Sequence, residues 1–506
     1  MAPALLVLAP LRIEALALSG PPPGAASIEV RRAGMGLAKA AARAREMTHL
    51  PDLGRYSAVA VAGLGGALER ELCPGDVVVA DRLVDGDGDE VAKLPSATLL
   101  AEQLCRSGLR ARTGTVASVD HIVTGPERAS LAKRGAVAVD MESTAIAGAK
   151  WGAPLAVVRA ISDSPGEELF SLAGARGVLR GLKSLHAARP ALANWAAAVR
   201  PREIWLFEPR SFCAGVERAV HTVERALEKY GAPVYVRRQI VHNAHVVSRL
   251  EAAGAIFVEE LSDVPDSATV VFSAHGVATS VHDEARERKM FTIDATCPLV
   301  SKVHTEVRRF ALSGRQVVLV GHKGHDEVEG TLGTVPGTLL VTTAADVDRL
   351  ETDPLTPTAV VTQTTLAIDE VADVVEALAA KFADLARPAA SDICYASQNR
   401  QEAVRALAPG CDVVLVVGSA NSSNSNRLVE VARRAGASAH LVNDKSELRL
   451  AWLTGAHRVG VSAGASAPDE LVQEVVQCLS GLGPVSVSSR STGTEHVLFP
   501  LPVEVR

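Results

Sequence analysis

Aromatic side chains are scarce in this chain of 506 residues, of which they make up 3%. Proteins that bind single-stranded nucleic acid stack the bases on aromatic rings, and this chain offers few of them. Acidic and basic residues are interspersed and sum to a net charge of -6, so the sequence has no strongly basic patch. Both absences argue against a nucleic-acid partner. A small-molecule substrate is the expectation.

Cysteine is sparse as well, with seven residues spread over the whole chain. An odd number of widely separated cysteines is not typical of the disulfide scaffold of a secreted protein. Long apolar runs are missing too, since none approaches the roughly 18 consecutive apolar residues of a membrane-spanning helix. Arg12 and Glu14 interrupt the apolar start of the chain, which predicts a buried strand instead of a signal peptide. We therefore expect a soluble cytoplasmic protein without a membrane span.

Short Val, Ala and Leu runs alternate with helical stretches along most of the chain, which predicts an α/β architecture. At about 150 residues per domain, this length predicts two to four domains. The alternation stops in a helical stretch that we expect to be interrupted at Pro190, and it restarts after Pro201. We expect four segments: a domain over 1–178, a helical linker over 179–202, a second domain over 203–485 and a C-terminal tail over 486–506.

Three cysteines lie where a predicted strand leads into a predicted helix. They are Cys213 in SFCAGVERA, Cys297 in DATCPLVSKVH and Cys394 in DICYASQNRQ, one in each third of the second domain. A structural zinc site usually draws on close CxxC pairs, and none is present here, so zinc is the weaker alternative. Three thiolates suit an iron–sulfur cluster whose fourth iron stays open to a substrate oxygen. Such a cluster acts both as a Lewis acid and as an electron donor.

Histidine and small polar side chains follow other strands of the same domain. The set comprises His242, His275, His325, Ser422, Ser423, Asn424 and Ser466. These are neutral or weakly cationic donors, and such donors can surround a diphosphate with hydrogen bonds. Glu327 follows His325 by two residues and is the carboxylic acid expected to deliver a proton. A solvated acidic run is the alternative interpretation of Glu327.

Residues 203–480 closely resemble the family of 4-hydroxy-3-methylbut-2-enyl diphosphate reductases, which act last in the non-mevalonate isoprenoid route. The shared motifs, in the family's order, are FCAGV, VHN, SAHGV, DATCPLV, GHxxHxEVEG, TQTTL, ICYASQNRQ, NSSNS and GASAP. The resemblance implies three similar α/β lobes around a 4Fe-4S cluster held by Cys213, Cys297 and Cys394. It also implies removal of the substrate's allylic hydroxyl as water with two electrons and two protons. An external donor such as ferredoxin or flavodoxin supplies the electrons. The implied products are isopentenyl and dimethylallyl diphosphate.

The same resemblance implies roles for individual residues. The histidines, serines and asparagine named above would bind the diphosphate, and Glu327 would be the proton source, relayed through Thr364. Asp326 departs from the family, in which proline is common at this position. We expect its charge to raise the protonation of the neighbouring His325.

The strongest motif of residues 1–178 is GAVAVDMESTAIAGAKWGAPLAVVRAISD. A strand, an acidic pair around Met141, a helix and a second strand ending in Ser-Asp suit a pocket for a ribose and its base. Glu142 can accept both ribose hydroxyls. Asp163, if burial protonates it, can donate to a purine nitrogen and improve the leaving group. For Asp140 and Asp163, a role as caps of strand ends is the alternative.

Together with AGMG, AGLGG and PGDVVVAD, this motif resembles the superfamily of nucleoside phosphorylases and methylthioadenosine/adenosylhomocysteine nucleosidases. Within it, the similarity is greatest to the hopanoid-associated phosphorylase that removes adenine from adenosylhopane. The resemblance implies a three-layer domain and a nucleoside substrate. Ile122 stands where many nucleosidases have an aromatic residue, which weakens stacking on the base. Glu14 matches the position that activates water, whereas Arg31 and Arg32 could serve phosphate, so both reactions remain open. A non-catalytic nucleoside-binding or assembly module is the alternative.

Overall fold

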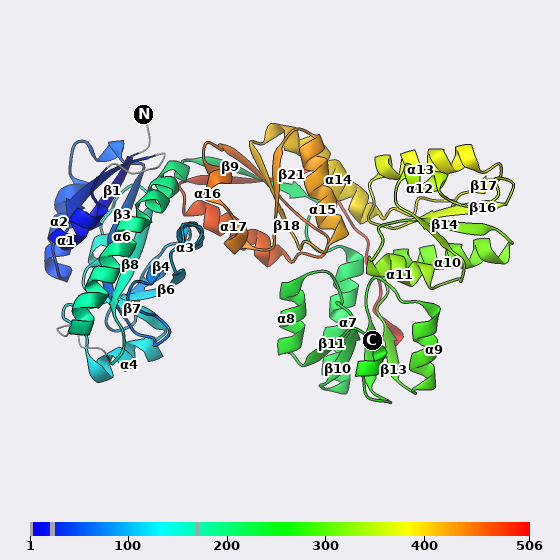
Figure 1. Cartoon of the computed structure of the whole chain (residues 1–506), viewed down its shortest axis with the longest axis horizontal. Coiled ribbons are helices and arrows are strands. Elements are labelled where there is room, and N and C mark those ends of the chain that lie inside the picture. Colours follow the sequence, from blue (N-terminus) through cyan, green and yellow to red (C-terminus); the bar gives the residue numbers. More distant parts are fainter. Residues whose placement is uncertain (1–3, 21–25, 167–171) are drawn as a thin grey trace. The chain divides into compact units, whose positions relative to one another are not determined.

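The computed structural model describes residues 4–20, 26–166 and 172–506 (Figure 1). The chain divides into two compact units. The first comprises Met1–Ile204, Asp444–Val459 and Gln473–Val487, and the second comprises Trp205–Asn443, Gly460–Val472 and Ser488–Arg506. This division differs from the predicted boundaries, because two segments of the expected second domain group with the first unit. Within that unit, α16 (Leu450–Leu453) packs against α3 (Ala97–Arg106) and α6 (Leu172–Ala198).

The first unit contains an eight-stranded mixed sheet. Its strands are β1 (Ala4–Ala9), β2 (Ser27–Arg32), β3 (Ala58–Ala67), β4 (Val77–Val84), β5 (Glu90–Lys93), β6 (Ala111–Ser118), β7 (Ala136–Asp140) and β8 (Leu155–Asp163). Their order is β2-β1-β3-β7-β6-β4-β5, and β8 pairs with both β3 and β4. The further helices are α1 (Arg12–Leu18), α2 (Leu37–Thr48), α4 (Gly125–Lys133) and α5 (Ser143–Ala147). The apolar runs of β1, β3 and β8 are buried, as expected for strands covered on both faces.

Helix α6 runs without interruption from Leu172 to Ala198, so the predicted break at Pro190 is wrong. Proline removes one backbone hydrogen bond from a helix, and burial of Leu192 and Trp195 in the following turns offsets that loss. Earlier in the helix, a Cβ at Gly177 would lie 2.0 Å from a backbone oxygen of β8, so glycine permits the close packing. The segment expected to be a linker is thus built into the first unit.

The chain from residue 202 onward forms three further sheets, which confirms the predicted three-lobed α/β architecture (Figure 1). The first is β11-β10-β12-β13, from β10 (Val234–Arg237), β11 (Ala255–Val258), β12 (Thr269–Phe272) and β13 (Phe291–Asp294). The second is β15-β14-β16-β17, from β14 (Gln316–Val320), β15 (Leu339–Val341), β16 (Thr358–Thr362) and β17 (Leu385–Ala386). The third is β19-β18-β20-β9-β21, from β9 (Arg202–Glu208), β18 (Val413–Val417), β19 (Ser438–Val442), β20 (Arg458–Ala463) and β21 (Val485–Ser491).

The first two of these sheets share one strand order, and all their pairings are parallel. The helices of this region are α7 (Ala214–Tyr230), α8 (Ala244–Ala252), α9 (Thr279–Glu287), α10 (Pro298–Leu312), α11 (Asp326–Leu332), α12 (Ala344–Asp348), α13 (Ile368–Lys381), α14 (Tyr395–Leu407), α15 (Ser423–Arg434) and α17 (Asp469–Ser480). Among the described residues, no helix combines the length and apolarity needed to cross a bilayer.

Candidate functional site

Three cysteines stand directly before three helices. Cys213 is the N-cap residue of α7, Cys297 of α10 and Cys394 of α14. These helices follow β9, β13 and β17, so the three sheets each supply one cysteine. The positive end of a helix dipole stabilises a thiolate. The three side chains line one cavity, where they can act as ligands.

Gly215, in the first turn of α7, lies against two of the sulfurs. A Cβ at this position would be 2.6 Å from the Sγ of Cys297 and 3.9 Å from the Sγ of Cys213. Glycine therefore keeps space open beside both thiols. Burial raises the pKa of Cys297 to about 12 and that of Cys394 to about 11, with the nearby Cys213 thiol adding to both. Bound metal cations would replace these protons and compensate the thiolate charge.

Three histidines line the same cavity. The rings of His242 and His275 stack with their centroids 4.1 Å apart, and His325 meets them edge-on at 5.2 and 5.7 Å. Burial lowers the pKa of His242, lowers that of His325 to about 4, and holds that of His275 well below its usual range. The three rings are therefore neutral near pH 7. Each neutral ring offers one N–H donor, and it can gain a proton when an anion binds.

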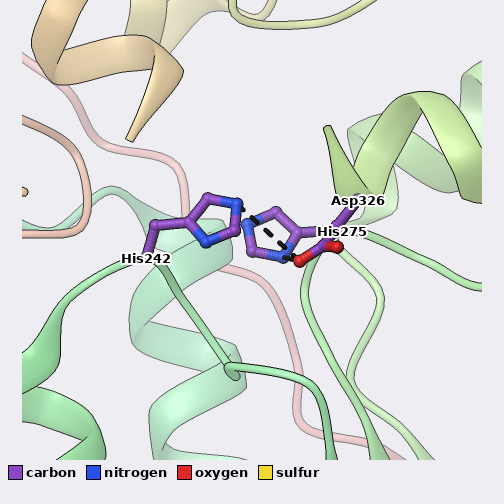
Figure 2. Close-up of side chains that lie close together, drawn as sticks. All are labelled: His242, His275 and Asp326. Carbon is purple, nitrogen blue, oxygen red and sulfur yellow. Dashed lines mark ion pairs between the residues drawn. The ribbon is translucent and has the colours of Figure 1, made fainter. Parts of the chain in front are cut away.

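Asp326 joins this cluster from the start of α11. Its Oδ2 lies 3.9 Å from Nε2 of His242 and 3.9 Å from Nδ1 of His275 (Figure 2). Its Oδ1 lies 2.5 Å from Nη1 of Arg238, which also contacts Glu329 at 2.6 Å. Asp326 raises the pKa of His325, as predicted, but burial and His242 outweigh that effect. The predicted direction of the Asp326 effect is therefore confirmed, although the net pKa of His325 lies below its usual value.

Glu327 is the buried carboxyl group of the cavity, with 2% of its surface exposed. Its Oε1 accepts a hydrogen bond from the backbone nitrogen of Thr364 at 2.7 Å, and its Oε2 accepts one from the Thr364 hydroxyl at 3.0 Å. Burial raises the pKa of Glu327 to about 7 and outweighs these two hydrogen bonds. A carboxyl group with this pKa can donate a proton at neutral pH.

Small polar side chains come from the third lobe. Ser422 is the N-cap residue of α15, and its hydroxyl accepts a hydrogen bond from the backbone nitrogen of Ser425, three residues further along, at 3.3 Å. The Ser466 hydroxyl donates to the backbone oxygen of His242 at 3.1 Å, and the Asn424 side chain accepts from the backbone nitrogen of Ala465 at 2.9 Å. These bonds fix the serine and asparagine side chains at the cavity wall.

The structure brings together all the site residues predicted for the second domain. One cavity is lined by Cys213, His242, His275, Cys297, His325, Glu327, Thr364, Cys394, Ser422, Ser423, Asn424 and Ser466. Thr365, a donor that the TQTT motif also offers, lines it as well. Sequence reasoning missed Tyr395, Ser397 and Phe499, which belong to the same lining. The first two lie inside the ICYASQ motif, so that motif could have indicated them. No motif surrounds Phe499.

A second cavity lies in the first unit and collects Glu14, Met141, Glu142 and Asp163, as predicted from the sequence. Glu14 belongs to α1, Met141 and Glu142 follow β7, and Asp163 ends β8. Glu14 is 2% exposed and accepts hydrogen bonds from two backbone nitrogens, both at 2.7 Å. Burial raises the pKa of both Glu14 and Glu142.

Two arginines that sequence reasoning missed hold these carboxylates. Arg159, which is fully buried, places Nε 2.7 Å from Oδ2 of Asp140 and Nη2 3.5 Å from Oε2 of Glu142. Arg128 forms an ion pair with Oδ2 of Asp163. Asp163 is buried as expected, and its carboxylate is paired with this guanidinium group. An arginine in a strand or helix gives no sequence signal that separates such a partner from a surface residue.

The two arginines considered for phosphate lie on β2, outside this cavity. Among the residues that the structure describes, neither Arg31 nor Arg32 lines the cavity. The Nε of Arg31 instead lies 2.8 Å from Oε1 of Glu29, with which it forms an ion pair. Ile122 does line the cavity and is 45% exposed. The apolar replacement noted in the sequence therefore faces the space in which a base would lie.

Comparisons with known proteins cover both halves of the chain. The family described as "LytB protein" matches residues 204–480, and the family described as "Phosphorylase superfamily" matches residues 24–182. The 4-hydroxy-3-methylbut-2-enyl diphosphate reductase of Polaromonas sp. is 54% identical over 301 residues, which are 59% of this chain and 90% of the relative. Reductase 1 of Rhodopseudomonas palustris is 54% identical over 303 residues, 60% of this chain and 99% of the relative.

A solved structure covers the same region. The E-1-hydroxy-2-methyl-but-2-enyl-4-diphosphate reductase from Plasmodium falciparum is 36% identical and has a TM-score of 0.58. The alignment covers 60% of this chain and 97% of that one. The region from β9 onward thus has relatives both in sequence and in fold.

Proposed function

The chain belongs to the LytB protein family, and we propose that it reduces 4-hydroxy-3-methylbut-2-enyl diphosphate to isopentenyl and dimethylallyl diphosphate. The predicted fusion of this reductase domain with a phosphorylase-like domain is confirmed by the two family matches. One observation carries the proposal. A single cavity combines three thiols at helix starts, a set of neutral donors and a buried carboxyl group.

The three cysteines suit a 4Fe-4S cluster better than a single zinc ion. Among the described residues, the group of ligand atoms close enough to hold one ion is His242, His275 and Asp326, and the cysteines form no such group. The three thiols are spaced too widely to hold one ion, and Gly215 leaves space open beside two of them. Both features support a larger inorganic group. When bound, a cluster with three thiolate ligands supplies electrons and leaves one iron open to a substrate oxygen.

The polar side chains would bind the diphosphate. His242, His275 and His325 are neutral before binding, and with the hydroxyl and amide groups of the third lobe they present donors instead of carboxylates. The anion would raise the protonation of these rings, and charged donors make the stronger hydrogen bonds. Glu327, oriented by Thr364, would hold the proton that leaves with the hydroxyl group as water.

Two electrons per turnover must come from outside the chain, so we propose a one-electron protein donor such as ferredoxin or flavodoxin. The ligand thiols must also stay reduced until iron binds. A reducing compartment such as the cytoplasm meets that need.

The test is an anaerobic preparation of the whole chain with iron and sulfide analysis and a reductase assay. We expect a brown protein that forms both five-carbon diphosphates from the hydroxylated substrate when an artificial one-electron donor is present. A colourless protein with bound zinc and no turnover would refute the reductase proposal.

For the first unit we propose cleavage of the N-glycosidic bond of a purine nucleoside, with water as the nucleophile. Glu14 is the carboxylate placed to accept the proton of water, and Glu142 the one placed for the ribose hydroxyls. Arg128, the guanidinium group in the described lining, is paired with Asp163, so a phosphate dianion would face mainly carboxylates. Ile122 and Met35 at the cavity suit an apolar substituent on the nucleoside.

Release of adenine from adenosyl nucleosides tests this second activity. The rate should not depend on added phosphate, and free ribosyl product should form. A strict phosphate requirement would establish phosphorolysis instead. Inactivity towards all adenosyl substrates would favour the alternative, a non-catalytic nucleoside-binding or assembly module.

Asp163→Asn is expected to lower nucleoside cleavage by about two to four orders of magnitude, the usual contribution of a general acid. Asparagine keeps the shape of the side chain, but it can neither carry a proton to the purine nor form the ion pair with Arg128. Adenine release by the variant is the measurement, and the reductase rate of the same preparation should be unchanged. Asp52→Asn, at an exposed position, is the control. An unchanged cleavage rate for Asp163→Asn would remove Asp163 from the acid role.

A further inference from the structure

We call residues 492–506, at the end of the chain, the C-terminal strap, and one of them reaches the reductase cavity. They have no helix or strand except a single turn of 3-10 helix at Val503–Val505. Phe499 lines the cavity together with the three cysteines. Leu498, the residue before it, is 83% exposed. The strap therefore directs one large apolar side chain into the cavity and its neighbour to solvent.

A buried arginine holds the first part of the strap. Nη1 of Arg400, on α14, lies 2.9 and 3.1 Å from the two carboxylate oxygens of Glu495. Nη2 of the same group donates to the backbone oxygen of Ser211 at 2.8 Å. Ser211 precedes Cys213 by two residues, and α14 begins directly after Cys394. The strap is thus tied to two of the three cysteine segments.

A second arginine holds the part around Phe499. Nε of Arg218, on α7, donates to the backbone oxygen of Pro500 at 2.8 Å, and its Nη1 donates to that of Thr296 at 3.0 Å. Thr296 is the residue before Cys297, so this link reaches the third cysteine segment. Both anchors of the strap therefore end at segments that carry the proposed ligands.

The end of the strap belongs to the core of the first lobe. Val505 is fully buried there, with Leu501 packed against the same cluster. Lys229 and Tyr230, at the end of α7, donate to the backbone oxygen of Glu504 at 2.7 and 2.6 Å. Contacts on both sides fix the position of Phe499, so its ring is a defined part of the cavity wall.

We infer that Phe499 is a positioning residue of the reductase site, which closes the cavity beside the cysteines and packs on the hydrocarbon part of the substrate. This inference rests on the proposed function. A five-carbon chain needs an apolar wall once its diphosphate is held by polar groups, and Leu299, Val300 and Ala396 are among the other apolar residues that line the cavity. A closed wall also keeps water and oxygen from the metal ligands.

The experiment uses the full chain, purified anaerobically with its iron. Phe499→Ala should raise the KM for the diphosphate substrate by about tenfold, as expected from losing the burial of an aromatic side chain, with a smaller change in kcat. The visible absorbance of the same variant should bleach faster in air than that of the wild type. Phe499→Leu keeps an apolar side chain and should show smaller shifts in the same direction.

Leu498→Ala is the matched control, because it shortens the exposed neighbour on the same strap. It should leave both KM and the bleaching rate at wild-type values. Unchanged values for Phe499→Ala, or equal effects of the two alanine variants, would overturn the inference while the reductase proposal stands. If Phe499→Ala does not fold, Phe499→Leu decides alone, and wild-type KM and bleaching would again overturn it. Absence of iron in the wild type would instead refute the reductase proposal itself.

Discussion

Replacing Cys394 by serine is expected to remove the bound iron and almost all reductase activity. A serine oxygen is a harder ligand than a thiolate and binds the irons of such a cluster poorly. The same result is expected for Cys213 and Cys297, because each is the one thiol that its segment brings to the cavity. Iron and sulfide per chain, together with visible absorbance after anaerobic purification, are the measurements.

Cys411→Ser is the matched control for this series. Cys411 packs at the core of the third lobe and does not line the cavity as described. Serine there should leave the iron content close to that of the wild type, with at most a modest loss of stability. Full iron and full turnover in Cys394→Ser would show that the ligand assignment is wrong.

The sequence was informative about the reductase site because its motifs sit at the carboxyl ends of buried strands. In open α/β sheets such ends gather where ligands bind. Each of the three cysteines was expected at a boundary between strand and helix, and each is found as the residue before a helix. The apolar runs predict the strands, and the small polar residues after them mark the strand ends, so local sequence is enough to place the three cysteines at these boundaries.

Charge partners could not be predicted in the same way. Arg159 lies in the apolar run VVRAIS, and the sequence does not reveal that it is fully buried between carboxylates. Arg238 and Asp326 are 88 residues apart and form an ion pair only because two lobes place them together. Such pairs depend on tertiary structure, which local periodicity does not encode.

The path of α6 through Pro190 could not be predicted from the local sequence either. Proline normally ends or kinks a helix, yet α6 continues through Pro190. The helix is held along its length by burial of Leu185, Leu192 and Trp195, and by close contact with β8 at Gly177. The C-terminal strap is the opposite case, since it has almost no regular structure and is nevertheless fixed by side-chain anchors.

Glu327→Gln is expected to lower reductase turnover by about two to four orders of magnitude and to leave substrate binding nearly unchanged. Glutamine has the same shape, so contacts with Thr364 can persist, but it has no carboxyl proton to donate. Burial raises the pKa of Glu327 to about 7. Wild-type turnover should therefore fall as the pH rises through about 7, because the carboxyl group loses its proton, whereas the residual rate of the variant should lack this step. The measurements are anaerobic steady-state kinetics with an artificial one-electron donor across this pH range.

Two further variants separate proton delivery from binding. Glu329→Gln changes a half-exposed carboxylate on the same helix that lies outside the described lining, and its turnover should stay close to that of the wild type. His275→Ala removes a donor to the diphosphate and should weaken substrate binding first, as seen in the spectral shift on adding substrate. Normal turnover in Glu327→Gln, or a loss of binding as complete as that in His275→Ala, would exclude Glu327 as the proton source. Turnover lost with binding retained would identify the buried carboxyl group as the acid, because burial is what keeps it protonated near pH 7.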